Sequence, residues 1–203
     1  MLRRRQPHVI LIAGPNGAGK ATIAPRVLQG TMAVKEFVNA DVIARGLSGF
    51  DPAGVALTAG RLMLERLEQL ASSRQNFAFE TTLASRPFAP RIRALRSDGY
   101  SFHLIYLWLP SADQAIARVA SRVLMGGHHV PDETVRRRYV AGIQNFFSLY
   151  RPIADSWRWY DNSNRENLRL IASGQTEKYE RVLDWKTWKA IAQVKQETFG
   201  PPG

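Results

Sequence analysis

Residues 14–22 read GPNGAGKAT, and this stretch decides the fold of the chain. It begins with the pattern G-x-x-x-x-G-K-[ST], except that Ala21 stands where the pattern has a hydroxyl residue. The apolar run HVILIA at 8–13 precedes it and predicts a strand that is buried on both faces. The helix predicted next runs from Gly19 to about Leu28. A glycine-rich loop between a buried strand and a helix predicts a site that binds phosphate groups.

The residue types of this loop favour contact with a nucleotide. Its glycines carry no side chains, so the backbone can curl around phosphates and direct its N–H groups inward at the positive end of the helix. Lys20 is expected to reach the β- and γ-phosphates of a nucleoside triphosphate. The alternative interpretation is a glycine-rich turn with an incidental lysine. The residues predicted to contact the nucleotide are Gly14, Pro15, Asn16, Gly17, Ala18, Gly19, Lys20, Ala21, Thr22, Arg118 and Arg136.

Ala21 raises the question of how the site holds a metal ion. A serine or threonine at this position normally gives its oxygen to Mg²⁺. Thr22 is the next residue, but one helical step turns its side chain by about 100°, so its hydroxyl does not simply substitute. Because Mg²⁺ keeps several waters and is shared with the substrate phosphates, a water can fill the gap. The sequence therefore predicts a site for ATP and Mg²⁺ in which the metal is bound more weakly.

Strand-like and helix-like segments alternate along the rest of the chain. Further strands are predicted at 36–39, 76–80, 102–109, 157–160 and 168–172, and helices at 52–71, 87–97, 112–125, from 131 onward and at 185–198. This alternation predicts an α/β fold of the P-loop NTPase or kinase type, a three-layer sandwich with a central, mostly parallel sheet and a helical lid. We expect a single domain over 1–203, with the lid at about 112–140 and a less distinctive tail at about 164–203.

Apolar residues at helical spacing are the candidates for the core. One set is Ala59, Leu62, Met63, Leu67 and Leu70, and the other is Val135, Tyr139, Ile143, Phe146 and Tyr150. Both sets are expected to face the sheet.

Two carboxylates follow predicted strands. Asp41 comes just after the strand at 36–39, and Glu80 ends the strand at 76–80. In a parallel sheet ligands collect beyond the carboxyl ends of the strands, so both acids should share one crevice with the glycine-rich loop. Transfer of a phosphoryl group needs a carboxylate to accept the proton of the attacking hydroxyl, which favours a catalytic role for both. The structural alternatives are a helix N-cap for Asp41 and a capping partner of the following threonines for Glu80.

Arginines gather in the region predicted as a lid. Arg118 and Arg122 are four residues apart and share one helix face. The run at 136–138 follows beyond a glycine break, so helix, break and helix can fold over bound phosphates and stabilise the charge on a moving phosphoryl group. The alternative for each arginine is a solvated surface charge. His128 and His129 lie in the same region, but no matching metal ligands accompany them.

The motifs GPNGAGK, FVNADVIA and FAFETT, followed by the arginines around GGHHVP, resemble those of the zeta toxin family of P-loop kinases. The resemblance covers about 9–163 and implies transfer of the ATP γ-phosphate to a hydroxyl of UDP-N-acetylglucosamine. It also implies that Asp41 is the general base, Glu80 an acidic substrate contact, Lys20 the loop lysine and Arg122 one of two lid arginines. For the second arginine, Arg118, Arg136 and Arg137 all compete. A separately encoded antitoxin is a further implied partner.

Composition limits the alternatives. Lys and Arg outnumber Asp and Glu by 28 to 17, giving a net charge of +11, which favours anionic partners. Nucleic acid is not expected, because no zinc finger or RNP aromatic signature accompanies the charge. The chain has no cysteine, so disulfides and thiolate chemistry are excluded. No apolar run approaches the roughly 20 residues that span a bilayer, so we expect no membrane contact and a cytoplasmic protein.

The hypothesis that combines these features is an ATP-dependent kinase that acts on a hydroxyl of a small, phosphorylated acceptor, with a UDP-amino sugar as the leading candidate. Its catalytic residues would be Lys20, Asp41, Glu80 and Arg122. The alternative is a catalytically weakened nucleotide-binding module that acts through a protein partner, which the alanine at position 21 motivates.

Overall fold

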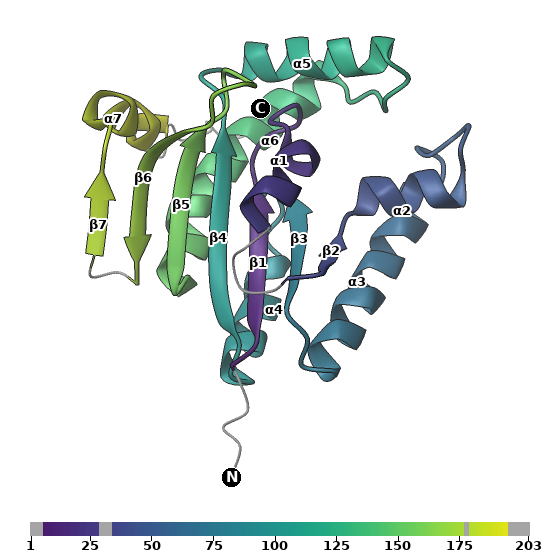
Figure 1. Ribbon diagram of the computed structural model, residues 1–203. Helices are drawn as coiled ribbons and strands as arrows, with labels where there is room; N and C mark the ends of the chain where they lie inside the picture. Colours follow the sequence, from purple (N-terminus) through teal and green to yellow (C-terminus); the bar gives the residue numbers. More distant parts are fainter. Residues whose placement is uncertain (1–5, 29–33, 177–178, 195–203) are drawn as a thin grey trace, which may run out of the picture.

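The computed structural model describes residues 6–28, 34–176 and 179–194. Within these residues a seven-stranded sheet has the order β2-β3-β1-β4-β5-β6-β7 (Figure 1). The strands are β1 His8–Ala13, β2 Glu36–Val38, β3 Phe77–Thr81, β4 Ser101–Trp108, β5 Ser156–Asp161, β6 Arg169–Gln175 and β7 Tyr179–Val182. The pairs from β2 to β5 are parallel, whereas β6 and β7 are added antiparallel at one edge. The prediction of a mostly parallel central sheet is confirmed.

Helices cover both faces of the sheet. They are α1 Lys20–Leu28, α2 Ala40–Leu47, α3 Ala56–Ser72, α4 Phe88–Ser97, α5 Ala112–Leu124, α6 Asp132–Asn145 and α7 Trp185–Val194, with the π-helix η1 Phe146–Tyr150 and the 3-10 turn η2 Arg151–Ile153 following α6. In Figure 1, α1 lies in front of β1, and α5 lies across the top of the sheet.

The strand at the centre shows why two layers of helices form. Successive side chains of a strand point to opposite faces, and β1 is apolar at every position after His8. Val9, Leu11 and Ala13 join the core on the face covered by α3, α4 and most of α6. Ile10 and Ile12 join the second core, which packs against α1 and α5. The α/β three-layer fold expected from the sequence is therefore confirmed.

Two elements were not predicted, and the prediction of one core residue was wrong. The short helix α2 and the edge strand β7 were missed. Leu62 retains 37% of its surface exposed, because it lies on the side of α3 away from the core that holds Met63 and Leu67. The other predicted core residues of both sets are buried. The predicted end of the last helix, beyond residue 194, lies outside the described residues.

Gly142 in α6 gives a test of how tightly this helix packs. A Cβ atom there would lie 2.5 Å from the carbonyl oxygen of Thr82 and 3.1 Å from the hydroxyl of Tyr106. Gly142→Ala should therefore lower the free energy of unfolding by about 1–3 kcal/mol, as overpacking does. Gly60 in α3 is the control, since a Cβ there meets nothing within 4 Å, and Gly60→Ala should add about 0.5–1 kcal/mol. Urea denaturation measures both, and equal changes in the two variants would contradict this packing.

In the part of the chain that the structure describes, no helix has the combination of length and apolar character that crossing a membrane requires.

Candidate functional site

The predicted site residues meet at the carboxyl ends of the parallel strands. The loop 14–19 follows β1, Asp41 lies in the first turn of α2 just beyond β2, and Glu80 lies near the end of β3. Glu80 is in register with Ile12 of β1, so its backbone lies beside the start of the loop. Parallel strands place these ends at one edge of the sheet, as the sequence predicted.

The glycines of the loop are required by close contacts and by backbone conformation. Gly14 has a φ of 142°, and a Cβ there would lie 2.2 Å from the carbonyl oxygen of Leu107. Gly17 has a φ of 78°, and its Cβ would lie 2.7 Å from the carbonyl oxygen of Ala115. Side chains at these positions would be both strained and blocked. The loop can therefore lie directly against β4 and α5.

Lys20 is the first residue of α1 and is buried, with 9% of its surface exposed. Its Nζ donates hydrogen bonds to the carbonyl oxygens of Gly14 and Pro15, each at 3.1 Å. Burial lowers the pKa of Lys20, and the charges of Glu80 and Asp41 oppose that shift. The ammonium is thus anchored on the loop and faces two acids, in the position that the sequence motif predicts.

Asp41 does not cap the helix in which it lies. The cap is the buried Asn39, whose Oδ1 accepts hydrogen bonds from the backbone N–H groups of Asp41 at 2.7 Å and Val42 at 3.2 Å. The structural alternative raised for Asp41, a helix N-cap, is therefore wrong. The Asp41 side chain lies instead on the wall of the cavities described below.

Glu80 is a partly buried acid next to Lys20. Its Oε2 is buried and has no hydrogen-bond partner among the described residues. Burial raises the pKa of Glu80, while the charge of Lys20 opposes this shift. The hydroxyls of Thr81 and Thr82 accept hydrogen bonds from the backbone N–H groups of residues 83 and 84. These threonine hydroxyls bond to the backbone of the turn that follows them. The alternative that Glu80 is their capping partner is therefore not supported.

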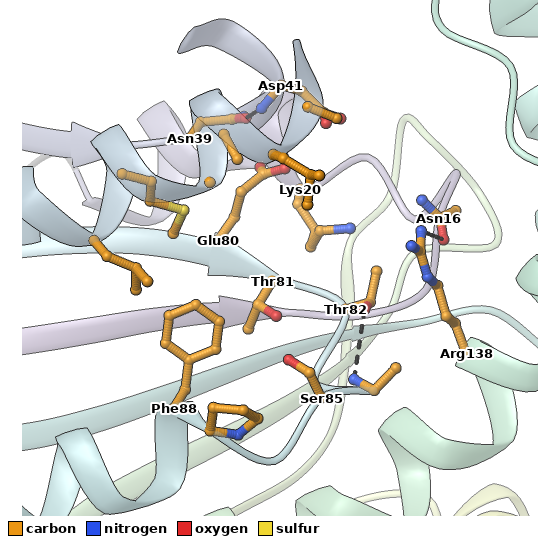
Figure 2. A pocket seen from close by; sticks show the side chains of 18 of the residues that line it. Asn16, Lys20, Asn39, Asp41, Glu80, Thr81, Thr82, Ser85, Phe88 and Arg138 are labelled. Carbon is orange, nitrogen blue, oxygen red and sulfur yellow. Dashed lines mark hydrogen bonds between the residues drawn. The ribbon is translucent and has the colours of Figure 1, made fainter. Parts of the chain in front are cut away.

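Two cavities meet at these residues. The larger, of about 990 Å³, lies between the loop, α3, α4 and α6 (Figure 2). The smaller, of about 360 Å³, lies between the loop, the start of α1, α5 and the segment after β5. The residues that line both are Asn16, Lys20, Asn39, Asp41 and Glu80. The predicted ammonium and both predicted acids therefore lie on the wall that the two cavities share.

The arginines of α5 lie where the sequence placed them. Arg118 donates from Nη2 to the carbonyl oxygen of Ser163 at 2.6 Å, and Arg122 donates from Nη2 to that of His128 at 2.7 Å. Both line the smaller cavity. Within the part of the chain that the structure describes, the Nε of Arg122 is buried and has no hydrogen-bond partner, so this guanidinium retains a donor at the smaller cavity.

Arg136 is not placed at the site, and this prediction needs correction. Its guanidinium pairs with Asp113 at 2.6 Å on the exposed surface of the two helices, and it lines neither cavity. Arg138 takes that place: it lines the larger cavity, and its Nη1 donates to Oδ1 of Asn16 at 3.4 Å (Figure 2). Successive helical residues differ by about 100°, so Arg136 and Arg138 flank the apolar face of Val135 and Tyr139 on opposite sides, and only one of them faces the cavity.

The smaller cavity also has lining residues that were not predicted, and three of them are polar or charged and reach it from α2 and from the segment after β5. They are Arg45 on α2 and Asn162 and Arg165 on the segment that follows β5. The sequence pattern gave no indication for the last two, because they lie far along the chain from the loop that they approach.

The donor set is suited to a hard cation such as Mg²⁺. Asp41, Glu80 and Thr22 supply oxygen atoms around the smaller cavity, and the unpartnered Oε2 of Glu80 can accept a water or a cation. Among the described residues no group of three or more His, Cys, Asp or Glu side chains forms a metal site. These residues therefore fit an ion that is held jointly by one or two carboxylates and by phosphate groups.

Comparison with known proteins places this architecture in a family. A model of the AAA domain family matches residues 9–141, the segment from β1 through most of α6. The chain belongs to the AAA domain family. The matched part of this AAA domain holds the loop, both acids, Arg122 and Arg138. An uncharacterized protein of Haemophilus influenzae is 27% identical over 134 residues, which are 66% of this chain and 94% of the relative.

Solved structures share the fold of this AAA domain. A chain of the AvrRxo1-ORF1:-ORF2 complex with ATP is 17% identical with a TM-score of 0.74, over 96% of this chain and 66% of that chain. A chain of the PezAT chromosomal toxin-antitoxin system of Streptococcus pneumoniae is 18% identical with a TM-score of 0.61, over 98% of this chain and 81% of that chain. This AAA domain therefore shares its α/β fold with both chains, and the whole chain spans about two thirds of the AvrRxo1 chain.

Proposed function

We propose that the protein transfers the γ-phosphate of ATP to a hydroxyl of a small molecule, with a UDP-amino sugar such as UDP-N-acetylglucosamine as acceptor. The observation that carries this proposal is the shared wall of the two cavities, in which Lys20, Asp41 and Glu80 lie between the phosphate loop and a second, larger space. A donor triphosphate in the smaller cavity would direct its terminal phosphate toward an acceptor in the larger one. Transfer of a phosphoryl group depends on this kind of positioning and on neutralised charge.

Each side chain has a role that follows from its place. The loop amides and Lys20 bind the phosphates, and Arg122 and Arg138 stabilise the charge of the phosphoryl group during transfer. Asp41 accepts the proton of the acceptor hydroxyl as its oxygen forms a bond to the γ-phosphorus and the bond from that phosphorus to the β-phosphate oxygen breaks. Glu80 orients the acceptor or the metal. The products are ADP and a phosphate monoester.

Mg²⁺ would be held by Glu80 or Asp41 together with the ATP phosphates, and it would neutralise their charge.

The larger cavity favours an acceptor that is part apolar and part anionic. Its lining combines Met63, Leu64 and Phe88 with the hydroxyls of Thr81 and Ser85. Arg61 and Arg137 also line it and can bind the acceptor's own phosphates. The zeta toxin resemblance indicates the same acceptor class. A separately encoded antitoxin is part of the proposal, which rests on that resemblance, and the fold is shared with a toxin-antitoxin system.

Product analysis tests the proposal. The protein is incubated with γ-labelled ATP, Mg²⁺ and a panel of UDP-sugars and other small alcohols, and the products are separated and identified by mass spectrometry. Label on a hydroxyl of a UDP-amino sugar is expected. Label on another alcohol would support the kinase activity but identify a different acceptor. ATP bound with no label transferred to any acceptor, or released as inorganic phosphate alone, would favour the alternative of a nucleotide-binding module, which Ala21 motivates.

The two arginines on one turn of α6 give a matched prediction. Arg138→Ala should lower the rate of transfer by about 10²–10³-fold, as loss of a donor to the developing charge does in other enzymes. Arg136→Ala should leave the rate within about twofold, because Arg136 forms an exposed ion pair with Asp113. Steady-state kinetics of both variants measure this difference. A larger loss in the Arg136 variant would reverse the assignment.

Restoring the hydroxyl at position 21 tests the role of the missing ligand. Ala21→Ser should lower the Mg²⁺ concentration needed for half-maximal ATP binding by about threefold to tenfold, since one hydrogen bond or ligand contributes on the order of 1 kcal/mol. ATP affinity at saturating Mg²⁺ should change little. A titration of ATP binding at increasing Mg²⁺ concentrations measures this requirement. An unchanged Mg²⁺ requirement would mean that a ligand at this position has no part in metal binding.

A further inference from the structure

Three consecutive residues at the end of β5, 161–163, connect separate parts of the molecule. Asp161 is buried, and its carboxylate accepts hydrogen bonds from the backbone N–H of Ser163 at 2.8 Å and from Arg169 of β6 at 3.0 Å. The carbonyl oxygen of Ser163 accepts the 2.6 Å hydrogen bond from Arg118 of α5. Asn162 lies between them and contacts the phosphate loop.

The backbone of Asn162 is hydrogen-bonded to the sheet, and its side chain is hydrogen-bonded to the phosphate loop. It has 2% of its surface exposed, and its backbone N–H donates to the carbonyl oxygen of Trp108 at the end of β4 at 3.0 Å. Its Nδ2 donates to the carbonyl oxygen of Ala18 in the phosphate loop at 2.7 Å. The orientation of the side-chain amide is fixed by this contact, because a flipped amide would bring two acceptor oxygens together.

The hydrogen bond to the carbonyl oxygen of Ala18 also orients the N–H group of Gly19, which belongs to the same peptide. In a planar trans peptide the C=O and N–H groups point in opposite directions. Holding the carbonyl of Ala18 toward Asn162 therefore turns the N–H of Gly19 away from Asn162. Gly19 has a φ of 78°, and a Cβ there would lie 2.9 Å from Nδ2 of Asn162. The side chain of Asn162 thus fits against a backbone conformation that glycine adopts readily.

We infer that Asn162 is a positioning residue of the phosphate loop, which fixes the Ala18–Gly19 peptide so that the amides at the start of α1 point at the phosphates of the nucleotide. It acts through the loop backbone and has no part in the transfer step. The contact reaches the loop from a strand that lies beyond β4, so it ties the loop to the edge of the sheet that carries β6 and β7.

The test uses two variants and a matched control. Asn162→Ala removes the donor, and Asn162→Asp replaces it with an acceptor of the same shape. Asn164→Ala and Asn164→Asp are the controls, because Asn164 lies in the same segment and is exposed. Its side-chain Oδ1 accepts a hydrogen bond from the backbone N–H of Glu166, and its backbone carbonyl accepts one from Asn167. The control to aspartate also matches the added negative charge.

Two measurements are made below the melting midpoint of every variant. Amide hydrogen exchange without nucleotide should become at least about tenfold faster across residues 15–21 in both Asn162 variants and stay unchanged in the α3 peptide. Calorimetric affinity for ATP should fall by about tenfold in Asn162→Ala and more in Asn162→Asp, with both controls within about threefold of the parent protein.

The outcomes separate this inference from the proposed function, on which its ATP measurement rests. If the parent protein binds no ATP, the proposed function fails, while exchange still decides the role of Asn162. Unchanged exchange in the loop of folded Asn162 variants would overturn the inference. Exchange that accelerates equally throughout the protein, or failure of both variants to fold, would also overturn it, because Asn162 would then support the fold as a whole.

Discussion

Lys20→Met is expected to reduce phosphoryl transfer by about 10²–10³-fold and to weaken ATP binding by at least about tenfold, since removing one preorganised charge has effects of this size. Methionine keeps the unbranched shape of the side chain but removes the ammonium that bonds to the carbonyl oxygens of Gly14 and Pro15. Glu80 would lose the positive charge that opposes the upward shift of its pKa. Its carboxyl should then take up a proton at a higher pH than in the parent protein.

The control for this variant is Lys189→Met, which changes the same residue type on the exposed side of α7. Calorimetry for ATP and steady-state rates are measured for both. Equal ATP affinity in Lys20→Met and the parent protein would show that the loop does not bind phosphate as described.

Asp41→Asn should lower the rate of transfer by about 10²–10⁴-fold, the range that a general base contributes. Asparagine has the same shape and keeps the backbone N–H that bonds to Asn39, so α2 should remain folded. It cannot accept the proton of the acceptor hydroxyl. ATP affinity should be unchanged or slightly tighter, because a negative charge near the phosphates is removed.

Asp51→Asn is the matched control, since Asp51 is exposed between α2 and α3 and lines neither cavity. Rates at saturating ATP and acceptor, together with the Kd for ATP, separate the chemical step from binding. A transfer rate in Asp41→Asn equal to that of the parent protein would remove Asp41 from the role of base and leave Glu80 as the candidate.

The fold could be predicted because its central strands have an unambiguous pattern. The run 8–13 is apolar throughout, the glycine-rich loop follows at once, and Pro110 marks the end of the strand at 102–109. The missed elements lack such signals. Ala44 is the buried residue of helix α2, so this helix has no long apolar stripe. Strand β7 is a short edge strand that pairs with β6.

The site was predictable where it follows strand ends and unpredictable where it depends on side-chain direction. Lys20, Asp41 and Glu80 could be placed because parallel strands end at one edge. The choice between Arg136 and Arg138 depends on a helical rotation of about 200°, which the charge run alone does not reveal. Asn162 contacts Ala18 across 144 positions of the chain, and no local pattern connects them.

A calorimetric titration of the parent protein with ATP and Mg²⁺ tests the central claim most directly, namely that the loop grips a triphosphate although Ala21 lacks the usual hydroxyl. We predict saturable binding of one ATP per chain, retained in Asp41→Asn and strongly weakened in Lys20→Met. Absence of any binding at millimolar ATP and Mg²⁺ would contradict the account.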